Sequence, residues 1–200
     1  MLLIRHRGVA GLLAAVLIAA FGRTSHAQAN TADVAFMQGM IAHHAQAIAM
    51  ADLIPARTTR REIQLLGQRI TVSQKDEIAL MRHWLEAHHE KVPALGEGGH
   101  EHHAGMAMPA DTLMPGMLTA DQMAKLSAAK GGDFDRLFLR GMIQHHGGAL
   151  QMVARLFASQ GAAQDPEVFG FASDVDADQR AEIARMQRLL DELQSDARRP

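Results

Sequence analysis

The sequence predicts an all-α protein, an antiparallel four-helix bundle built from two repeated helical hairpins. One nine-residue stretch is written twice, as residues 36–44 (FMQGMIAHH) and residues 138–146 (FLRGMIQHH), 102 positions apart. A second repeat follows each copy: residues 74–85 and 179–190 share Gln, Glu, Ile, Met and Leu at an offset of 105. Two hairpins with matching apolar stripes are expected to bury those stripes against each other.

Apolar residues at helical spacing support the first hairpin, which is expected to span residues 30–91. Its first helix is expected to begin at a cap on Thr31 or Asp33 and to continue to Ile54, because Pro55 follows. The second helix runs back beside it and ends before the next proline.

Residues 92–118 differ in composition and are predicted to form a His/Met-rich flexible linker, since Gly and Pro are frequent and no period is sustained. Short His-rich tracts commonly bind metal, and clustered Met adds soft sulfur donors. The alternative is a solvated spacer with incidental His and Met. With the two His residues just before the linker, the candidate ligands are His88, His89, His100, His102, His103, Met106, Met108, Met114 and Met117.

Residues 119–200 are expected to hold a short helix and the second hairpin, so that residues 30–200 make one bundle domain. Thr119 begins a capping-box pattern for the short helix. Asp133 or Asp135 then opens the helix that carries the second His pair. The last helix begins at Asp165-Pro166, which supplies a cap and a proline at the first helical position.

Residues 1–29 resemble a secretory signal peptide, with two arginines before an apolar run over residues 9–21. The run is shorter than the roughly 20 residues of a membrane span. Small residues after it place cleavage near Ala27 to Ala29, so we expect a periplasmic or secreted protein. The alternative is an uncleaved N-terminal anchor, which would be the protein's one attachment to a membrane.

The charge of the chain argues against a nucleic-acid partner. The sequence has 20 Lys and Arg against 22 Asp and Glu, and three of the basic residues lie in the leader. The mature chain therefore keeps 17 basic residues and is acidic overall. A nucleic-acid surface would need clustered positive charge instead.

The repeated stretch places imidazoles and thioethers on one side of a helix. At about 100° per residue, Met40 lies within one turn of both His43 and His44, and the second copy repeats the arrangement. The two imidazoles of a pair diverge by about 100°, so one metal would also need donors from other helices. The alternative is a buried His-Glu network that specifies the bundle, with Met as ordinary core. The candidate ligands in the hairpins are Met40, His43, His44, Met50, Glu77, Met81, Met142, His145, His146, Met152, Glu182 and Met186.

Composition favours copper among the metals. The chain has 12 His, 13 Met and no Cys. Thioether sulfur suits Cu(I), while imidazole suits Cu(I), Cu(II) and zinc, so Cu(I) is favoured over Cu(II) and zinc is less suited. The helices with the His pairs contain no Glu, which disfavours a di-iron carboxylate centre.

The motif Met-Ile-x-His-His, with Asp upstream and Gln-x-x-Glu-Ile-x-x-Met downstream, resembles the bacterial family labelled domain of unknown function 305. The resemblance covers residues 31–91 and 119–194. It implies a ferritin-like helical fold and, because some members are exported copper-binding proteins linked to copper tolerance, a similar role here. The double glycine after His146 and the His/Met-rich linker depart from the family pattern. The motif falls on Met40, His43, His44, Glu77 and Met81, and on Met142, His145, His146, Glu182 and Met186.

These observations predict a periplasmic copper-binding protein that sequesters or transfers copper through His and Met ligands. Its expected partners are metal ions and another copper carrier or an efflux component. No nucleophile and base stand in a recognisable arrangement, so we do not expect an enzyme. Two alternatives stay open: a ferritin-like metal oxidase, and a structural or interaction bundle with no metal role.

Overall fold

The computed structural model describes residues 29–94 and 113–196, and within these ranges every regular element is a helix. Residues 1–28 of the predicted signal peptide and residues 95–112 of the linker lie outside them. The helices are α1 (Thr31–Ala51), α2 (Ile54–Arg57), α3 (Arg61–Ala87), α4 (Ala120–Ala128), α5 (Gly131–Ala158) and α6 (Pro166–Asp196). None of these helices is both long and apolar enough to cross a membrane.

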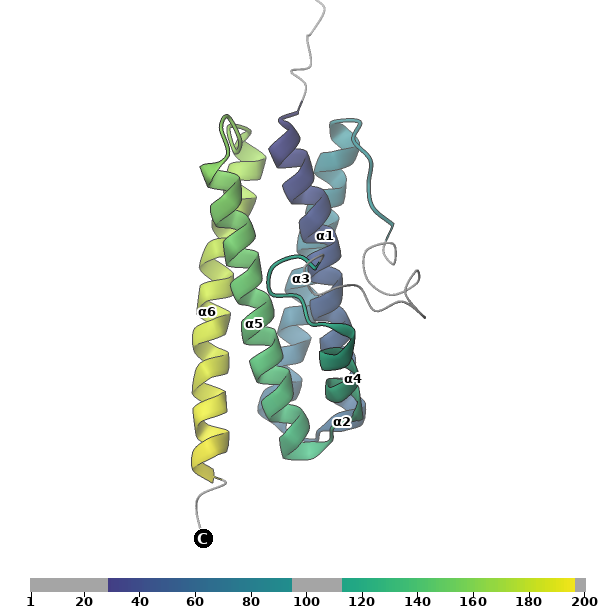
Figure 1. Cartoon of the computed structure of the whole chain (residues 1–200), viewed down its shortest axis with the longest axis vertical. Coiled ribbons are helices and arrows are strands. Elements are labelled where there is room, and N and C mark those ends of the chain that lie inside the picture. The colour runs from purple at the N-terminus through teal and green to yellow at the C-terminus, as the bar shows by residue number, and fades with distance from the viewer. Residues whose placement is uncertain (1–28, 95–112, 197–200) are drawn as a thin grey trace, which may run out of the picture.

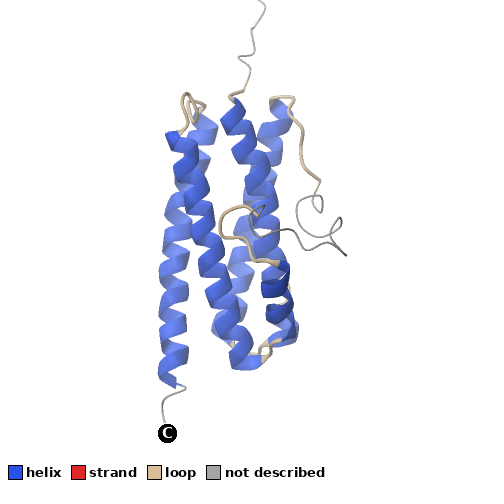
Figure 2. Cartoon of the chain, in the orientation of Figure 1, coloured by secondary structure: helices blue, strands red, loops and turns tan. Residues whose placement is uncertain are grey.

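The four long helices form an antiparallel bundle of two hairpins, as predicted (Figures 1 and 2). Helices α1 and α3 pair in the first hairpin, and α5 and α6 pair in the second. The hairpins meet along α1 and α5, while short α4 packs on α5 and α2 packs on α3. Residues 113–118, the last part of the connection from α3 to α4, lie over α1 and α5 (Figure 1).

Two apolar clusters form the core, and both hairpins contribute to each. One cluster contains Phe36 and Trp84, and the other contains Phe134 and Phe138. Their large side chains are almost fully buried. Burial of apolar surface on this scale is the main stabilising contribution in a bundle without disulfides.

Several helix ends follow local sequence chemistry. Thr119 forms the predicted capping box with Gln122 at the start of α4. At the start of α6, Asp165 Oδ1 accepts from the backbone N–H groups of Glu167 and Val168, at 2.8 and 3.3 Å. Pro55, expected to end the first helix, instead stands at the start of α2, where a proline costs no hydrogen bond.

Asp33 and Asp135 are not helix caps, contrary to expectation. Asn30 caps α1, accepting from the backbone N–H of Ala32 at 2.8 Å. Asp33 is buried and accepts from the N–H of Ala163 at 2.7 Å. The equally buried Asp135 pairs with Arg60 Nε at 3.0 Å. Each Asp thus ties the start of its hairpin to the turn of the other hairpin.

Candidate metal centre

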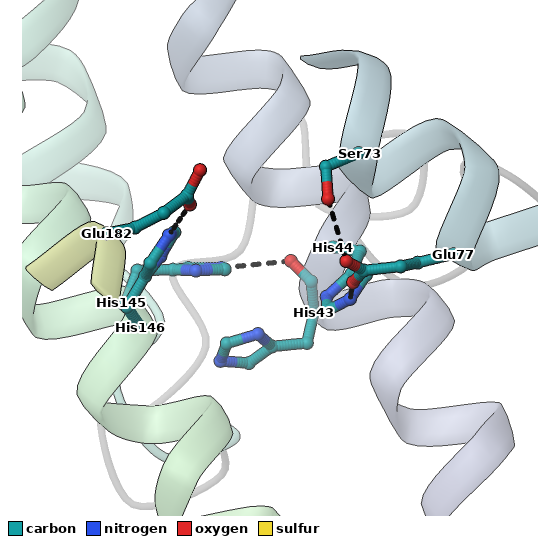
Figure 3. Close-up of polar contacts among 7 residues, drawn as sticks. All are labelled: His43, His44, Ser73, Glu77, His145, His146 and Glu182. Atoms are coloured by element: carbon teal, nitrogen blue, oxygen red, sulfur yellow. Dashed lines mark hydrogen bonds and ion pairs between the residues drawn. The ribbon is translucent and has the colours of Figure 1, made fainter. Parts of the chain in front are cut away.

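Four imidazoles lie at the centre of the bundle, between the two apolar clusters (Figure 3). His43 and His44 come from α1, and His145 and His146 come from α5; all four side chains are fully buried. The rings of His43 and His145 meet across the interface of the two hairpins, with centroids 3.8 Å apart. We call these four residues the histidine layer.

Every imidazole in the histidine layer is held through its Nε2 atom. His146 Nε2 donates to Glu182 at 2.7 Å, and His44 Nε2 pairs in the same way with Glu77. His43 Nε2 donates to the carbonyl of Pro115 at 3.0 Å, and His145 Nε2 donates to the carbonyl of His43 at 2.9 Å. All four partners are acceptors, so the proton of each neutral ring sits on Nε2.

The opposite ring nitrogen, Nδ1, is buried and without a hydrogen-bond partner in all four residues. Leaving such a polar atom unpaired in a protein interior costs about 1–3 kcal/mol. With the proton on Nε2, each Nδ1 carries a free lone pair. The layer therefore presents four unused nitrogen donors of the kind that metals bind.

Burial keeps the rings of His43 and His145 neutral. Desolvation, reinforced by the neighbouring His44, lowers the pKa of His43 to about 3. Desolvation and the charges of the other three His residues hold the pKa of His145 well below its usual range. Because a protonated ring cannot bind a metal, a low pKa leaves the lone pairs available at neutral pH.

The two glutamates hold the imidazoles from the outer side of the bundle. Burial raises the pKa of Glu77, but the hydrogen bond and charge of His44 and the hydrogen bond from Ser73 outweigh it, so the pKa is lowered. Ser73 Oγ donates to Glu77 Oε1 at 2.8 Å. Glu182, in the second hairpin, has its Oε1 3.8 Å from Arg69 Nε of α3. A carboxylate on the far nitrogen of an imidazole is the usual support of a His metal ligand.

Fully buried thioethers stand on both sides of the histidine layer. Met40 and Met81 belong to one apolar cluster, and Met142 and Met186 belong to the other. Met40 and Met142 lie one helical turn before their His pairs, and Met81 and Met186 lie one turn after the two glutamates. The predicted soft donors therefore flank the nitrogen donors, and each hairpin supplies the same set.

The other two methionines of the predicted helix ligands, Met50 and Met152, pack on glycines of the opposite hairpin. A β-carbon on Gly39 would lie 3.5 Å from Met152 Cε, and one on Gly141 would lie 3.1 Å from Met50 Cε. Met114 Sδ also lies 3.5 Å from that position on Gly39. These glycines give the methionines room to lie across the α1–α5 interface.

Residues 113–118, which we call the strap, pack over this interface, although the sequence predicts a flexible linker there. Gln46 holds Leu118 in both directions: its Nε2 donates to the Leu118 carbonyl at 2.9 Å, and its Oε1 accepts from the Leu118 N–H at 2.7 Å. Gly116 has φ of +76° and lies against the backbone of Gly148. A side chain on Gly148 would collide with the Pro115 carbonyl.

Other predicted ligands lie apart from the layer or outside the described residues. His88 stacks on Trp84, and its Nε2 lies 3.5 Å from Asp165 Oδ2. His89 is exposed beyond the end of α3, and Met117 is buried in the strap. The other linker candidates, which lie outside the described residues, are His100, His102, His103, Met106 and Met108.

Sequence reasoning missed several residues that shape the centre. Gln46 holds the strap, Ser73 supports Glu77, and the Pro115 carbonyl accepts from His43. Gln74 and Gln179 are buried with unpartnered Oε1 atoms. The sequence does show that this Gln recurs in the second repeat, and a polar residue repeated on an apolar stripe indicates a buried polar role.

Within the described ranges, no three imidazole or carboxylate groups converge on one point. Nitrogen and carboxylate donors alone therefore do not make a complete site. Thioether sulfur is the remaining donor beside the layer, and sulfur with imidazole suits a soft or borderline ion.

The chain matches a known family and known structures along most of its length. The family model described as "Domain of unknown function (DUF305)" matches residues 33–190. The crystal structure of a DUF305 fragment from Deinococcus radiodurans is 29% identical with a TM-score of 0.68, covering 82% of this chain and 98% of that one. A DUF305 protein of Streptomyces coelicolor, predicted to be secreted, is 26% identical with a TM-score of 0.66, covering 81% and 92%.

A further similar structure is that of CopM in its Cu(II)-bound form. It is 30% identical with a TM-score of 0.61, covering 80% of this chain and 96% of CopM. CopM has also been solved in Cu(I)-bound, Ag-bound and apo forms. None of the curated proteins compared with the chain matches it.

Proposed function

Since the chain belongs to the DUF305 family, we propose that it is an exported copper-binding protein that sequesters copper or passes it on in the periplasm. The likeness to CopM, solved with Cu(I), Cu(II) and Ag, supports a metal-binding role. The signal-peptide pattern of residues 1–29 supports export.

One observation carries this proposal: the four buried Nδ1 atoms that have no partner. A purely structural His network would be expected to pair both ring nitrogens, since unpaired buried polar atoms are costly. Here each ring is fixed through one nitrogen and offers the other. The fully buried thioethers of Met40, Met81, Met142 and Met186 make the surroundings soft, which favours Cu(I) over zinc.

In this proposal the histidine layer and the flanking methionines supply the ligands. Glu77 and Glu182 orient the imidazoles instead of binding the ion themselves, because each is already engaged with an Nε2 atom. The His and Met residues of the linker capture copper more loosely. The protein binds copper stoichiometrically and does not turn over a substrate.

A Cu(I) competition titration against a chromophoric chelator tests the proposal on the mature protein. The bundle variant combines His44→Gln and His146→Gln, and the control combines His100→Gln, His102→Gln and His103→Gln. We expect tight binding to disappear in the bundle variant and to persist in the control, with thermal unfolding showing that both fold. Equal binding by the wild type and the bundle variant would contradict the proposal. Oxygen consumption beyond the bound copper would point to an oxidase instead.

A further inference from the structure

The bundle covers the histidine layer unequally on its four sides. The α1–α3 and α5–α6 sides are the tightly packed hairpin interfaces. The α1–α5 side is overlaid by the strap, whose Pro115 carbonyl is bonded to His43. Helices α3 and α6 are the least closely packed of the neighbouring pairs. An ion therefore meets the least packed protein between solvent and the histidine layer on this side.

A groove runs between α3 and α6. It consists of two adjoining hollows of about 350 and 260 Å³, which share Arg69 and Arg185 in their walls. The hollow of about 260 Å³ is also lined by Ser73, Asp178 and Glu182. We call the two hollows together the α3–α6 groove.

Two partly exposed carboxylates contact the histidine layer on this side: Glu182, which lines the groove, and Glu77, which is bonded to Ser73 of its wall (Figure 3). Glu182 is 15% exposed and bonded to His146, which is fully buried. Glu77 is 18% exposed and bonded to the fully buried His44, while its other oxygen accepts from Ser73 in the groove wall. One carboxylate from each helix thus stands between water and an imidazole with a free Nδ1.

The groove also carries an outer carboxylate and a counter-charge. Asp178 lies one helical turn before Glu182, and burial together with the charges of Glu77 and Glu182 raises its pKa. Glu77 belongs to α3 and Glu182 to α6, so Asp178 interacts electrostatically with carboxylates of both helices. Arg69, 3.8 Å from Glu182, offsets part of this negative charge.

Two buried amides precede the two glutamates on the same helices. Gln74 and Gln179 stand one turn before Glu77 and Glu182 on the same helices, and they are 1% and 3% exposed. The Oε1 atom of each has no hydrogen-bond partner. Amide and carboxylate oxygens are donors that replace water around a cation.

We propose that the α3–α6 groove is the port through which copper reaches and leaves the histidine layer. Asp178, Glu77 and Glu182 attract the hydrated cation, and Arg69 and Arg185 in the walls oppose it. The inference rests on the proposed copper-binding function. Charged side chains that line a cleft change the rate at which an ion associates with it. A single charge removed or restored should therefore change the rate of binding measurably.

Stopped-flow quenching of the one tryptophan, Trp84, by Cu(II) measures that rate on the mature protein. Every arm carries His88→Gln, His89→Gln, His100→Gln, His102→Gln and His103→Gln, so that binding at these predicted ligands, one of which stacks on Trp84, does not mask the bundle. Asp178→Asn should slow association about threefold to tenfold, and Arg69→Gln should speed it up. The matched control Asp191→Asn removes a charge from an exposed site of α6 and should leave the rate unchanged. The differences should shrink at high salt.

The outcomes separate the port from the proposed function. If the parent protein of this series binds neither Cu(I) in the competition titration nor Cu(II), the copper-binding function of the bundle fails and the port fails with it. If it binds Cu(I) but no Cu(II), the function stands and a port for Cu(II) is wrong. If it binds tightly but Asp178→Asn and Asp191→Asn associate at the same rate, the function stands and the port is wrong. An Arg69→Gln variant that binds no faster than its parent would likewise overturn the role of that arginine.

Discussion

At the scale of single residues, the centre depends on which nitrogen of each imidazole is engaged. Glu77 holds His44 through Nε2, which turns Nδ1 toward the interior of the bundle and makes it the free donor. An acceptor on the far nitrogen also raises the basicity of the ligating one. Residues that never touch a metal can thereby set its affinity.

Glu77→Gln tests this positioning role, since it removes the charge and keeps the shape. We expect copper affinity to fall by about 10–100-fold, the usual effect of losing such a partner. A Cu(I) competition titration measures the change. Glu86→Gln, on the exposed face of the same helix, is the matched control and should bind like the wild type. Unchanged affinity in Glu77→Gln would show that the carboxylate does not support a ligand.

Met81→Leu tests whether the thioethers act as ligands or only as core. Leu keeps nearly the same volume, so stability should change by less than about 1.5 kcal/mol. Affinity for Cu(I) should fall at least about tenfold and affinity for Cu(II) should fall less, because soft sulfur prefers Cu(I). Met123→Leu on α4 provides the control, since Met123 lies outside the proposed ligand set. Equal losses for the two oxidation states would contradict a sulfur ligand.

At the scale of elements, the strap is the feature that breaks the symmetry of the two hairpins. It supplies the Pro115 carbonyl to His43, whereas the equivalent His145 bonds to the carbonyl of His43. The strap can lie this close because Gly148 has no side chain. The second glycine of the pair, Gly147, has open space around its Cβ position.

The adjacent glycines give a matched pair of variants. Gly148→Ala should lower the free energy of unfolding by about 1–3 kcal/mol, since the new methyl group collides with the strap backbone. Gly147→Ala should be neutral or stabilising by up to about 1 kcal/mol, because Ala is the better helix former. Urea unfolding followed by circular dichroism measures both. Similar effects at the two positions would mean that the strap does not pack on Gly148.

These elements also show what the sequence alone could predict. The hairpins, the Thr119 capping box and the Asp165 cap depend on local or periodic patterns, and all three predictions were confirmed. Asp33 was wrongly expected to be a cap because its partner, the N–H of Ala163, lies 130 positions away. The hydrogen bonds between Gln46 and Leu118 join residues 72 positions apart, and no local sequence pattern predicts them. A helical wheel places the His pairs on one side, but it cannot tell which ring nitrogen is engaged.

At the scale of the whole molecule, folding places neutral imidazoles between two apolar clusters. Desolvation lowers the pKa of His43 to about 3, against 6.5 for an exposed imidazole, and lowers the pKa of His145 as well. The lowered pKa of Glu77 also makes the stability of the folded state fall with the pH, through protonation of its carboxylate at lower pH. The stability of the metal-free bundle is therefore linked to pH.

The metal-free protein should lose stability as the pH falls from about 6.5 toward 3. Below pH 6.5 the unfolded chain binds a proton at His43 that the folded state does not bind until about pH 3, so acid favours unfolding. Above pH 6.5 neither state binds this proton and the destabilisation is absent. His43 alone should account for on the order of 3 kcal/mol by pH 4. Urea unfolding at a series of pH values measures the slope. His43→Gln should flatten it, whereas His83→Gln, on the exposed face of α3, should not. Identical slopes for the wild type and His43→Gln would contradict a buried, neutral His43.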